Sequence, residues 1–266
     1  CTRPQLQTLA TTYLSFQTLN STTFLPLSPT FTYTENDRAI PSPLAPSTFL
    51  STSLTIHFTL TLYDPLLCAS LIEINAASAT TPYVVLARLT GTLSNTTSAL
   101  ELSTLDTVVS SPGDWLFNAT SHLTYARSES WSPIPLSLPL RTSRVALQAA
   151  ADAYLDQWGN VTLPVPLGTP CARLEGGEYT GKANATANTC AMPAFPEPLD
   201  VRNRRYVVDE EMGAVGVLNG FPLLEVTLKK GEATPSGNVF RVEGGLVRYI
   251  HEVTVCWTKG FPGCGR

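Results

Sequence analysis

The sequence predicts an α+β protein built from two tandem copies of one unit, each a helix packed on a curved antiparallel sheet. The main observation is an internal repeat, because residues 2–14 match residues 143–155 with a shift of 141 positions. The length of 266 residues suits two domains of ordinary size. We therefore expect a first unit at 1–112, a connector at 113–142 and a second unit at 143–266.

Each copy opens with a predicted helix. Apolar residues recur at i, i+3 or i+4, and i+7 or i+8, which is the spacing of one buried helical face. A Thr or Ser precedes each helix and can cap its first turn. The matched pairs include Thr2 with Ser143, Arg3 with Arg144, Leu6 with Leu147, Ala10 with Ala151, and Tyr13 with Tyr154.

Strands follow each helix. In the first unit, residues 31–37 begin as a strand and end in turn residues, 53–63 alternate strictly, and the remaining strands are 68–76, 83–91 and 99–110. About four antiparallel strands wrapped on one helix would leave a cavity at the open end of a cone.

The second unit repeats this plan. Its predicted strands are 171–177, a hairpin over 201–221, 223–230, 238–245 and 246–257. The acids of the hairpin turn at 209–213 are expected in water at its tip.

The connector at 113–142 contains Trp115, Trp131 and several prolines. Leaving these tryptophans and the nearby leucines in water would be costly, so we expect the connector to pack between the units.

Composition excludes several classes of protein. The net charge of −4 comes without a cluster of Lys and Arg, so we expect no nucleic-acid partner. No apolar run approaches the roughly 18 residues of a membrane span. Only three histidines are present, without metal-ligand spacing, and no phosphate loop, dinucleotide fingerprint or GxSxG motif occurs. We expect no metal and no cofactor.

Cysteines and glycosylation motifs predict a secreted protein, as does a chain that starts at Cys1, where a signal peptide would have been removed. Two cysteine pairs bracket short loops, which leaves a third pair to tie the amino terminus to the first sheet. The expected disulfides are Cys171 with Cys190, Cys256 with Cys264, and Cys1 with Cys68. The five Asn-x-Ser/Thr sites are Asn20, Asn95, Asn118, Asn160 and Asn184.

The order of helix, acidic strand end, hairpin and a final FRVEGGLVRYIHEV resembles the nuclear-transport-factor-2-like (SnoaL-like) fold. The phrases YTEND, GDWLFNAT, GTPCARLEGGEYTG and NRRYVVDEEMGAV resemble a family of secreted fungal proteins of unassigned function. This resemblance implies two tandem cones of that fold. Many enzymes of the fold use a polar cavity for isomerisation, dehydration, cyclisation or epoxide opening, while other members only bind.

Matching the two copies brings out candidate catalytic residues. A shift of 140 aligns Glu35 with Glu175 at the end of the first strand, where apolar walls would raise the pKa of a carboxyl. A shift of 145 aligns Asp106 with His251, whereas a shift of 146 would select Glu252 instead. The sequence does not decide which face of the last strand lines the cavity.

Glu175 and His251 form the expected acid/base couple, because a histidine titrates nearest neutral pH. Glu35 and Asp106 would form a second site or a degenerate copy of the first. The residues expected to bind substrate are Tyr179, Arg173, Arg204 and Trp115. His57 and His122 rank lower.

The predicted function is a cofactor-free lyase or isomerase that acts on an oxygen-rich small molecule or sugar derivative outside the cell. A second hypothesis is a non-catalytic protein that binds a glycan or metabolite, and it would depend on Trp115, Trp131, Trp158 and Trp257. A third is a glycoside hydrolase with two carboxylates across an open groove. The oligomeric state is not predicted.

Overall fold

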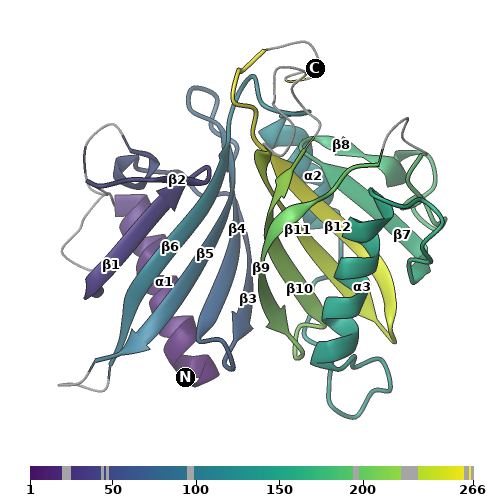
Figure 1. Ribbon diagram of the computed structural model, residues 1–266, viewed down its shortest axis with the longest axis horizontal. Helices are drawn as coiled ribbons and strands as arrows, with labels where there is room; N and C mark the ends of the chain where they lie inside the picture. Colours follow the sequence, from purple (N-terminus) through teal and green to yellow (C-terminus); the bar gives the residue numbers. More distant parts are fainter. Residues whose placement is uncertain are drawn as a thin grey trace.

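The computed structural model describes residues 1–19, 25–42, 45, 48–94, 99–193, 198–222, 233–260 and 264. It contains two curved six-stranded sheets, each with one helix on its concave side (Figure 1). The predicted α+β fold with two tandem units is therefore confirmed. None of the described helices is long and apolar enough to cross a membrane.

The first unit starts with a helix capped by polar residues and continues with strands in a fixed order. The sheet order is β2-β1-β6-β5-β4-β3. Its elements are α1 (Arg3–Leu19), β1 (Leu27–Glu35), β2 (Arg38–Ala39), β3 (Phe58–Asp64), β4 (Ala69–Ala76), β5 (Tyr83–Leu93) and β6 (Leu100–Ser110).

The second unit has the same topology, with the sheet order β8-β7-β12-β11-β10-β9. The Ser143 side chain caps its helix by accepting a hydrogen bond from the amide of Ala146, as the sequence predicted. Its elements are α3 (Arg144–Gln157), β7 (Leu167–Glu175), β8 (Glu178–Tyr179), β9 (Arg202–Asp209), β10 (Ala214–Phe221), β11 (Thr234–Glu243) and β12 (Leu246–Thr254). The expected strand at 223–230 lies outside the described residues.

One strand pair in each sheet is parallel, which the expectation of antiparallel sheets missed. β1 lies parallel to β6, and β7 lies parallel to β12. The periodicity of a strand reports which face is buried and not the direction in which the strand runs, so the sequence pattern could not reveal this.

Each unit has its own core between helix and sheet. Leu6, Tyr13 and Phe16 of α1 pack on the concave face of the first sheet. Leu147, Tyr154 and Leu155 of α3 do the same in the second unit. These residues carry the helical spacing seen in the sequence, so burial of one apolar stripe accounts for the position of both helices.

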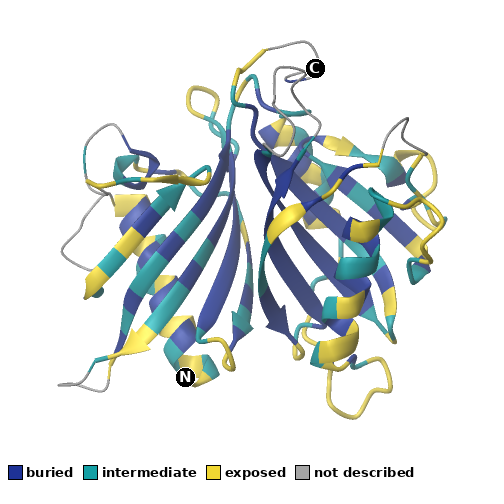
Figure 2. Cartoon of the chain, in the orientation of Figure 1, coloured by how far each residue is buried: buried dark blue, intermediate teal, exposed yellow. Residues whose placement is uncertain are grey.

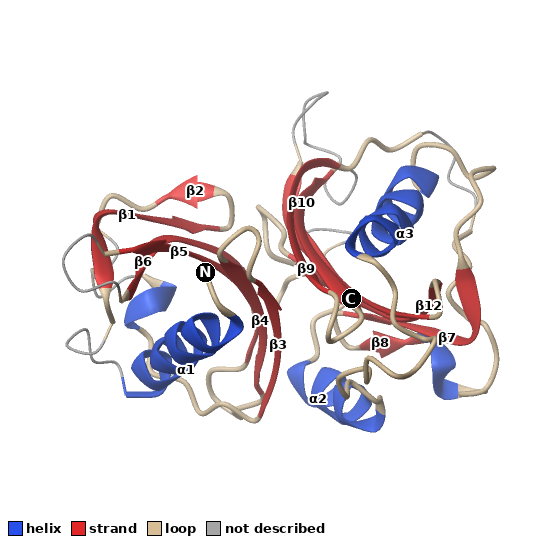
Figure 3. Cartoon of the chain, turned by 90° about the horizontal axis from the view of Figure 1, so that it is seen from below, coloured by secondary structure: helices blue, strands red, loops and turns tan. Residues whose placement is uncertain are grey.

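A third core joins the two units, because the convex faces of the sheets pack back to back (Figure 3). Strands β3 and β4 face β9 and β10 across this contact, and β4 and β10 are buried along their whole length (Figure 2). Leu71 and Gly216 occupy the third position of β4 and of β10, and they meet each other: a Cβ on Gly216 would lie 2.9 Å from Leu71 Cδ1. Equivalent positions therefore face one another across the interface.

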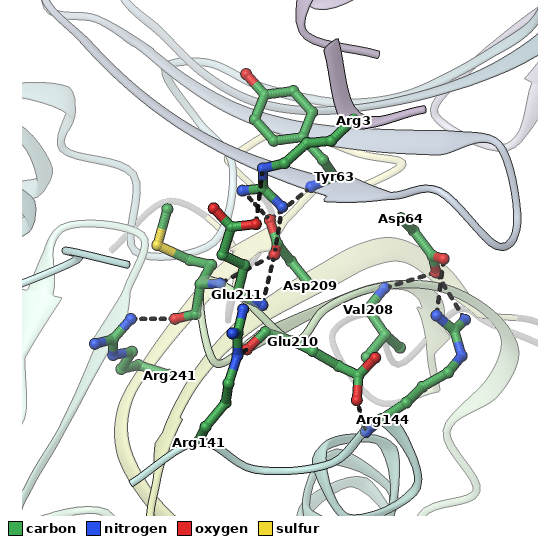
Figure 4. A network of polar contacts seen from close by, with 11 residues as sticks. Arg3, Tyr63, Asp64, Arg141, Arg144, Val208, Asp209, Glu210, Glu211 and Arg241 are labelled. Atoms are coloured by element: carbon green, nitrogen blue, oxygen red, sulfur yellow. Dashed lines mark hydrogen bonds and ion pairs between the residues drawn. The ribbon is translucent and has the colours of Figure 1, made fainter. Parts of the chain in front are cut away.

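Two reciprocal ion pairs close one end of this interface (Figure 4). Arg3 at the start of α1 binds both carboxylate oxygens of Asp209 in the second unit, at 2.9 and 3.0 Å. Arg144 at the start of α3 binds both oxygens of Asp64 in the first unit, at 2.7 Å each. The expectation that Asp209 lies in water is wrong, since it is 1% exposed.

The connector forms a helix that the sequence analysis did not predict, α2 (Ala119–Ser128). Asn118 caps it, and it packs on β4 of the first unit and on β7 and β8 of the second. The three expected disulfides are present: Cys1–Cys68, Cys171–Cys190 and Cys256–Cys264. The boundaries at 112/113 and 142/143 stay predictions.

Candidate functional site

The interior of the second unit contains a polar row across three neighbouring strands. Asn238 of β11 pairs with Glu252 of β12, which pairs with Glu175 of β7. Residues paired across strands point to the same face of a sheet, so these side chains share the concave side with Arg173, two positions before Glu175. A second row, Asn219, Ser236 and Thr254, follows directly beside the first.

These side chains are linked, but one buried amide oxygen has no partner among the described residues. Thr254 donates to Glu252 Oε1 at 2.9 Å, and Asn219 Nδ2 donates to Asn238 Oδ1 at 3.0 Å. Arg173 Nη1 lies 3.1 Å from Glu175 Oε1 as an ion pair. Asn219 Oδ1 is buried and accepts no hydrogen bond from any described residue, whereas Glu175 Oε1 has the ion pair with Arg173. Buried polar atoms are normally bonded, so Asn219 Oδ1 marks a place where another molecule could bind.

Glu252 has the environment of a proton-transfer group. Burial raises the pKa of Glu252 to about 7, and the charge of Glu175 adds to the rise. Tyr154 of α3 lies over this region, and burial raises the pKa of its hydroxyl, against the opposing effect of the Arg173 charge. The site therefore combines a carboxyl that titrates near neutral pH with a guanidinium and a phenol.

The equivalent acid of the first unit is used structurally. Glu35 takes the place of Glu175, since it pairs with Thr107 as Glu175 pairs with Glu252. Its Oε2 accepts hydrogen bonds from the Tyr33 hydroxyl and from the Phe49 amide, each at 2.9 Å. The bond from Phe49 anchors a neighbouring segment to the sheet, which is a structural role for this acid at the end of a strand.

The structure does not bring Glu175 and His251 together. His251 pairs with Leu174 and precedes Glu252, so its ring points to the convex face while Glu175 points to the concave one. The expected acid/base couple is therefore wrong. The strand register of the two sheets also supports a shift of 145 between the copies. Asp106 is then the equivalent of His251, and Thr107 is the equivalent of Glu252.

His251 belongs instead to a buried ion cluster between the units, made of Glu73, His122, Glu129 and His251. Glu73 of β4 contacts His122 Nε2 at 2.8 Å and His251 Nδ1 at 2.8 and 3.0 Å. Glu129 contacts His251 Nε2 at 2.6 Å. Burial alone would lower the pKa of His251, but Glu73 and Glu129 outweigh it and raise the pKa to about 10.

Each side chain of this cluster lies at hydrogen-bond distance from its partner. The Gly176 carbonyl oxygen lies 2.6 Å from His122 Nδ1 and can only accept, so His122 donates there. Its Nε2 lies 2.8 Å from Glu73 Oε1. Ligand atoms of Glu73, His122 and His251 lie within 4.8 Å of one another, a spacing that a small cation could also use. Since these atoms contact one another directly at hydrogen-bond distance, we interpret the cluster as an ionic one.

The other candidate residues lie apart from the polar interior. Arg204 binds Asp152 and Asp156 of α3 at 3.0 and 2.6 Å. Tyr179 stacks on Tyr125 of α2, with ring centroids 4.5 Å apart.

Two further candidates also have structural contacts. Asp106 binds Arg88 at 3.3 Å and accepts a hydrogen bond from Thr34 at 2.6 Å. The carbonyl oxygen of Trp115 lies against the turn at Gly176. Of the four expected to bind substrate, only Arg173 lies in the interior row.

All four tryptophans are half-buried and form no exposed strip. Trp131 packs on His251, with ring centroids 5.1 Å apart, and Trp158 packs on Phe221 at 4.7 Å. Arg38 lies over the Trp257 ring at 4.2 Å.

Three of the glycosylation motifs lie within the described residues. Asn118, Asn160 and Asn184 are exposed. Asn20 and Asn95 lie outside the described residues.

Sequence reasoning missed Glu73 and the importance of His122, and it offered Glu252 only as an alternative to His251. A lone acid inside an otherwise apolar strand was the available signal for Glu73, within ASLIEINA. Such an acid is rarely buried without a partner, which points to a cation elsewhere in the chain. For Glu252, the signal would have been the polar alternation of Asn238, Ser236 and Thr234 on the facing strand.

Residues 140–254 match the model of a domain of unknown function (DUF8021). The matched stretch runs from just before α3 to the end of β12, so it coincides with the second unit. No functionally curated protein matches the chain.

Proposed function

We propose that the second unit is a cofactor-free lyase or isomerase, with Glu252 as its proton-transfer residue. The observation that carries this proposal is Glu252 itself: a 5% exposed carboxyl beside Glu175 and Arg173, with a pKa raised by burial to about 7. A carboxylate with such a pKa is present in quantity at neutral pH and is a stronger base than an ordinary one.

The reaction begins with transfer of a proton from a carbon next to a carbonyl group. The C–H bond breaks, the proton passes to Glu252, and the electron pair moves to the carbonyl oxygen as an enolate. Arg173 supplies the positive charge that stabilises this oxygen, and Glu175 holds Arg173 in place. Return of the proton to a neighbouring carbon gives isomerisation, while departure of a β-hydroxyl as water gives dehydration. The substrate is a small oxygen-rich molecule.

The arrangement of helix and sheet supports a nuclear-transport-factor-2-like assignment for both units. The strand phrases of the sequence support membership of the secreted fungal family, and three disulfides support an extracellular location. The glycan-binding alternative receives less support, because all four tryptophans are half-buried. The glycoside hydrolase alternative needs two carboxylates that face an open groove, whereas Glu252 is only 5% exposed.

Hydrogen exchange of candidate substrates tests the proposal without knowledge of the natural one. A panel of small hydroxyketones, ketoacids and sugar lactones is incubated with the protein in D2O, and deuterium incorporation at carbon is followed by NMR. We expect incorporation into at least one class, reduced at least about 100-fold by Glu252→Gln. Glu35→Gln, the matched change in the first unit, should leave the rate within about twofold. Equal rates in wild type and Glu252→Gln would overturn the proposal.

A further inference from the structure

Glu175 and Glu252, the two carboxylates of the proposed site, are each adjacent in sequence to a residue that is hydrogen-bonded outside the site. Glu175 is followed by Gly176, whose carbonyl oxygen accepts a hydrogen bond from His122 Nδ1 at 2.6 Å. Glu252 is preceded by His251, whose Nδ1 contacts Glu73 at 2.8 Å. The Gly176 amide donates to the Glu252 carbonyl oxygen at 3.0 Å, so the two strand ends are also joined directly.

The turn after Glu175 is enclosed by the connector. The Gly177 amide donates to the Leu116 carbonyl oxygen at 2.7 Å, and the Ser121 hydroxyl donates to the Gly177 carbonyl oxygen at 2.5 Å. Gly176 has φ +58, and a Cβ there would lie 2.6 Å from the Leu116 oxygen. The backbone of the turn therefore touches the connector directly, with no room for a side chain.

The matching turn of the first unit is not enclosed in this way. Asn36 takes the place of Gly176, and its own Oδ1 accepts a hydrogen bond from the Val109 amide at 2.7 Å. The next residue, Asp37, is exposed and pairs with Arg205 at 2.6 Å. The clamp by a helix and a buried histidine is thus a feature of the second unit, where the proposed site lies.

Glu73 links both halves of this clamp. It is 0% exposed, belongs to β4 of the first unit, and is the shared partner of His122 and His251. An unpaired carboxylate at this depth would be very unfavourable, so the two imidazole rings stay on Glu73 and are fixed in orientation by it.

We propose that Glu73 is a positioning residue for the site of the second unit: through His122 and His251 it fixes the strand ends that carry Glu175 and Glu252. The expected effect of Glu73 on catalysis rests on the proposed function. In this proposal the first unit, whose own interior has no polar row, supplies the buried carboxylate that positions the site of the second unit.

Glu73→Gln tests the link, because the amide keeps the size of the side chain and loses its charge. The matched control is Asp64→Asn, which also neutralises a fully buried carboxylate of the first unit that crosses the interface. Backbone amide exchange is measured at Gly176 and Gly177 and compared with Val215 of β10, which reports opening of the second sheet. In Glu73→Gln, we expect the two turn amides to exchange about tenfold faster relative to Val215.

Asp64→Asn should leave this ratio unchanged, and Glu73→Asp, which keeps the charge, should restore most of the protection. An unchanged ratio in Glu73→Gln would overturn the proposal. If Glu73→Gln does not fold, His122→Gln removes the contact between Glu73 and Gly176 from the side of α2. The exchange rate of the Gly176 and Gly177 amides relative to Val215 is then measured in that variant, with the same expected and contradicting results.

The deuterium-transfer reaction adds a functional readout. We expect Glu73→Gln to lower kcat about tenfold with little change in KM, and Asp64→Asn to lower neither. Equal kcat values in the two variants would contradict positioning. If instead the turn loosens in Glu73→Gln while Glu252→Gln retains full transfer, the clamp is supported and the proposed function is the part that fails.

Discussion

The two units share one topology but differ in what fills them. Where the second unit has Asn219, Ser236 and Asn238, the register of the first unit gives Ile74, Val85 and Ala87. Glu252 and Thr254 correspond to Thr107 and Val109, and Arg173 corresponds to Tyr33. An apolar interior stabilises a fold, whereas a buried polar group costs free energy unless it is hydrogen-bonded. Proteins tolerate this cost mainly at functional sites. This difference is the reason why our proposal places the active site in the second unit and gives the first unit a structural role.

The largest change in the free energy of unfolding is expected at the matched position of Ile74 in the first unit and Asn219 in the second. Ile74→Asn places an amide without partners among the apolar residues of the first core and should lower the free energy of unfolding by about 4 kcal/mol. Asn219→Leu in the second unit should cost less than about 1.5 kcal/mol, because one oxygen of Asn219 has no described partner to lose. Denaturant unfolding measures both, and similar costs would remove the contrast between the interiors.

The reciprocal ion pairs should be equivalent in energy. Arg144→Met leaves Asp64 buried without its cation, and Arg3→Met does the same to Asp209. Because each arginine is about one fifth exposed, we expect each change to cost about 2 to 3 kcal/mol, within about 1 kcal/mol of each other. Arg202→Met, at an exposed pair, should cost less than about 0.5 kcal/mol. A difference of several kcal/mol between Arg3 and Arg144 would argue against equivalent roles.

Stability should depend on the ionisation of Glu252. Its pKa is raised from 4.5 to about 7 in the folded protein, so the folded state binds this proton more tightly than the unfolded state. The contribution is complete below pH 4.5 and is lost as the pH rises through 7, and it amounts to about 3 kcal/mol. Glu252→Gln should therefore have a Tm several degrees above wild type at pH 8 and equal to it at pH 4. A parallel pH profile of Tm in both proteins would contradict the burial of this charge.

The smallest effect is expected at the structural acid of the first unit. Glu35→Gln weakens the bonds from the Tyr33 hydroxyl and the Phe49 amide and should lower the free energy of unfolding by about 1 kcal/mol. The protein should keep its deuterium-transfer activity. Loss of activity in this variant would move a working site into the first unit.

The sequence predicted those features that local pattern controls. Helix spacing located α1 and α3, alternation located the strands, and loop length paired the cysteines. The α2 helix was missed because its apolar stripe is short and lies within a connector that contains Trp and several Pro residues, although Asn118 before it and Arg127 in its last turn fit the ends of a helix.

The candidate site was predicted only in part. Glu175 and Arg173 were found through the repeat, but the choice of His251 over Glu252 depended on which face of β12 lines the interior. That choice is set by the pairing of β12 with the parallel strand β7, a contact between residues far apart in sequence. The ion cluster joins β4, α2 and β12, so its formation depends on packing between the units, which no local pattern encodes.

Titration of the Glu252 carboxyl tests the central claim most directly. With glutamate labelled by 13C at the carboxyl carbon, and Glu252→Gln used for assignment, the account predicts a midpoint near pH 7 in the wild type. In Glu175→Gln the midpoint should fall by about one unit, because the neighbouring charge is gone. A midpoint at the ordinary 4.5 in both proteins would show that Glu252 is neither buried nor coupled to Glu175, and would contradict the account.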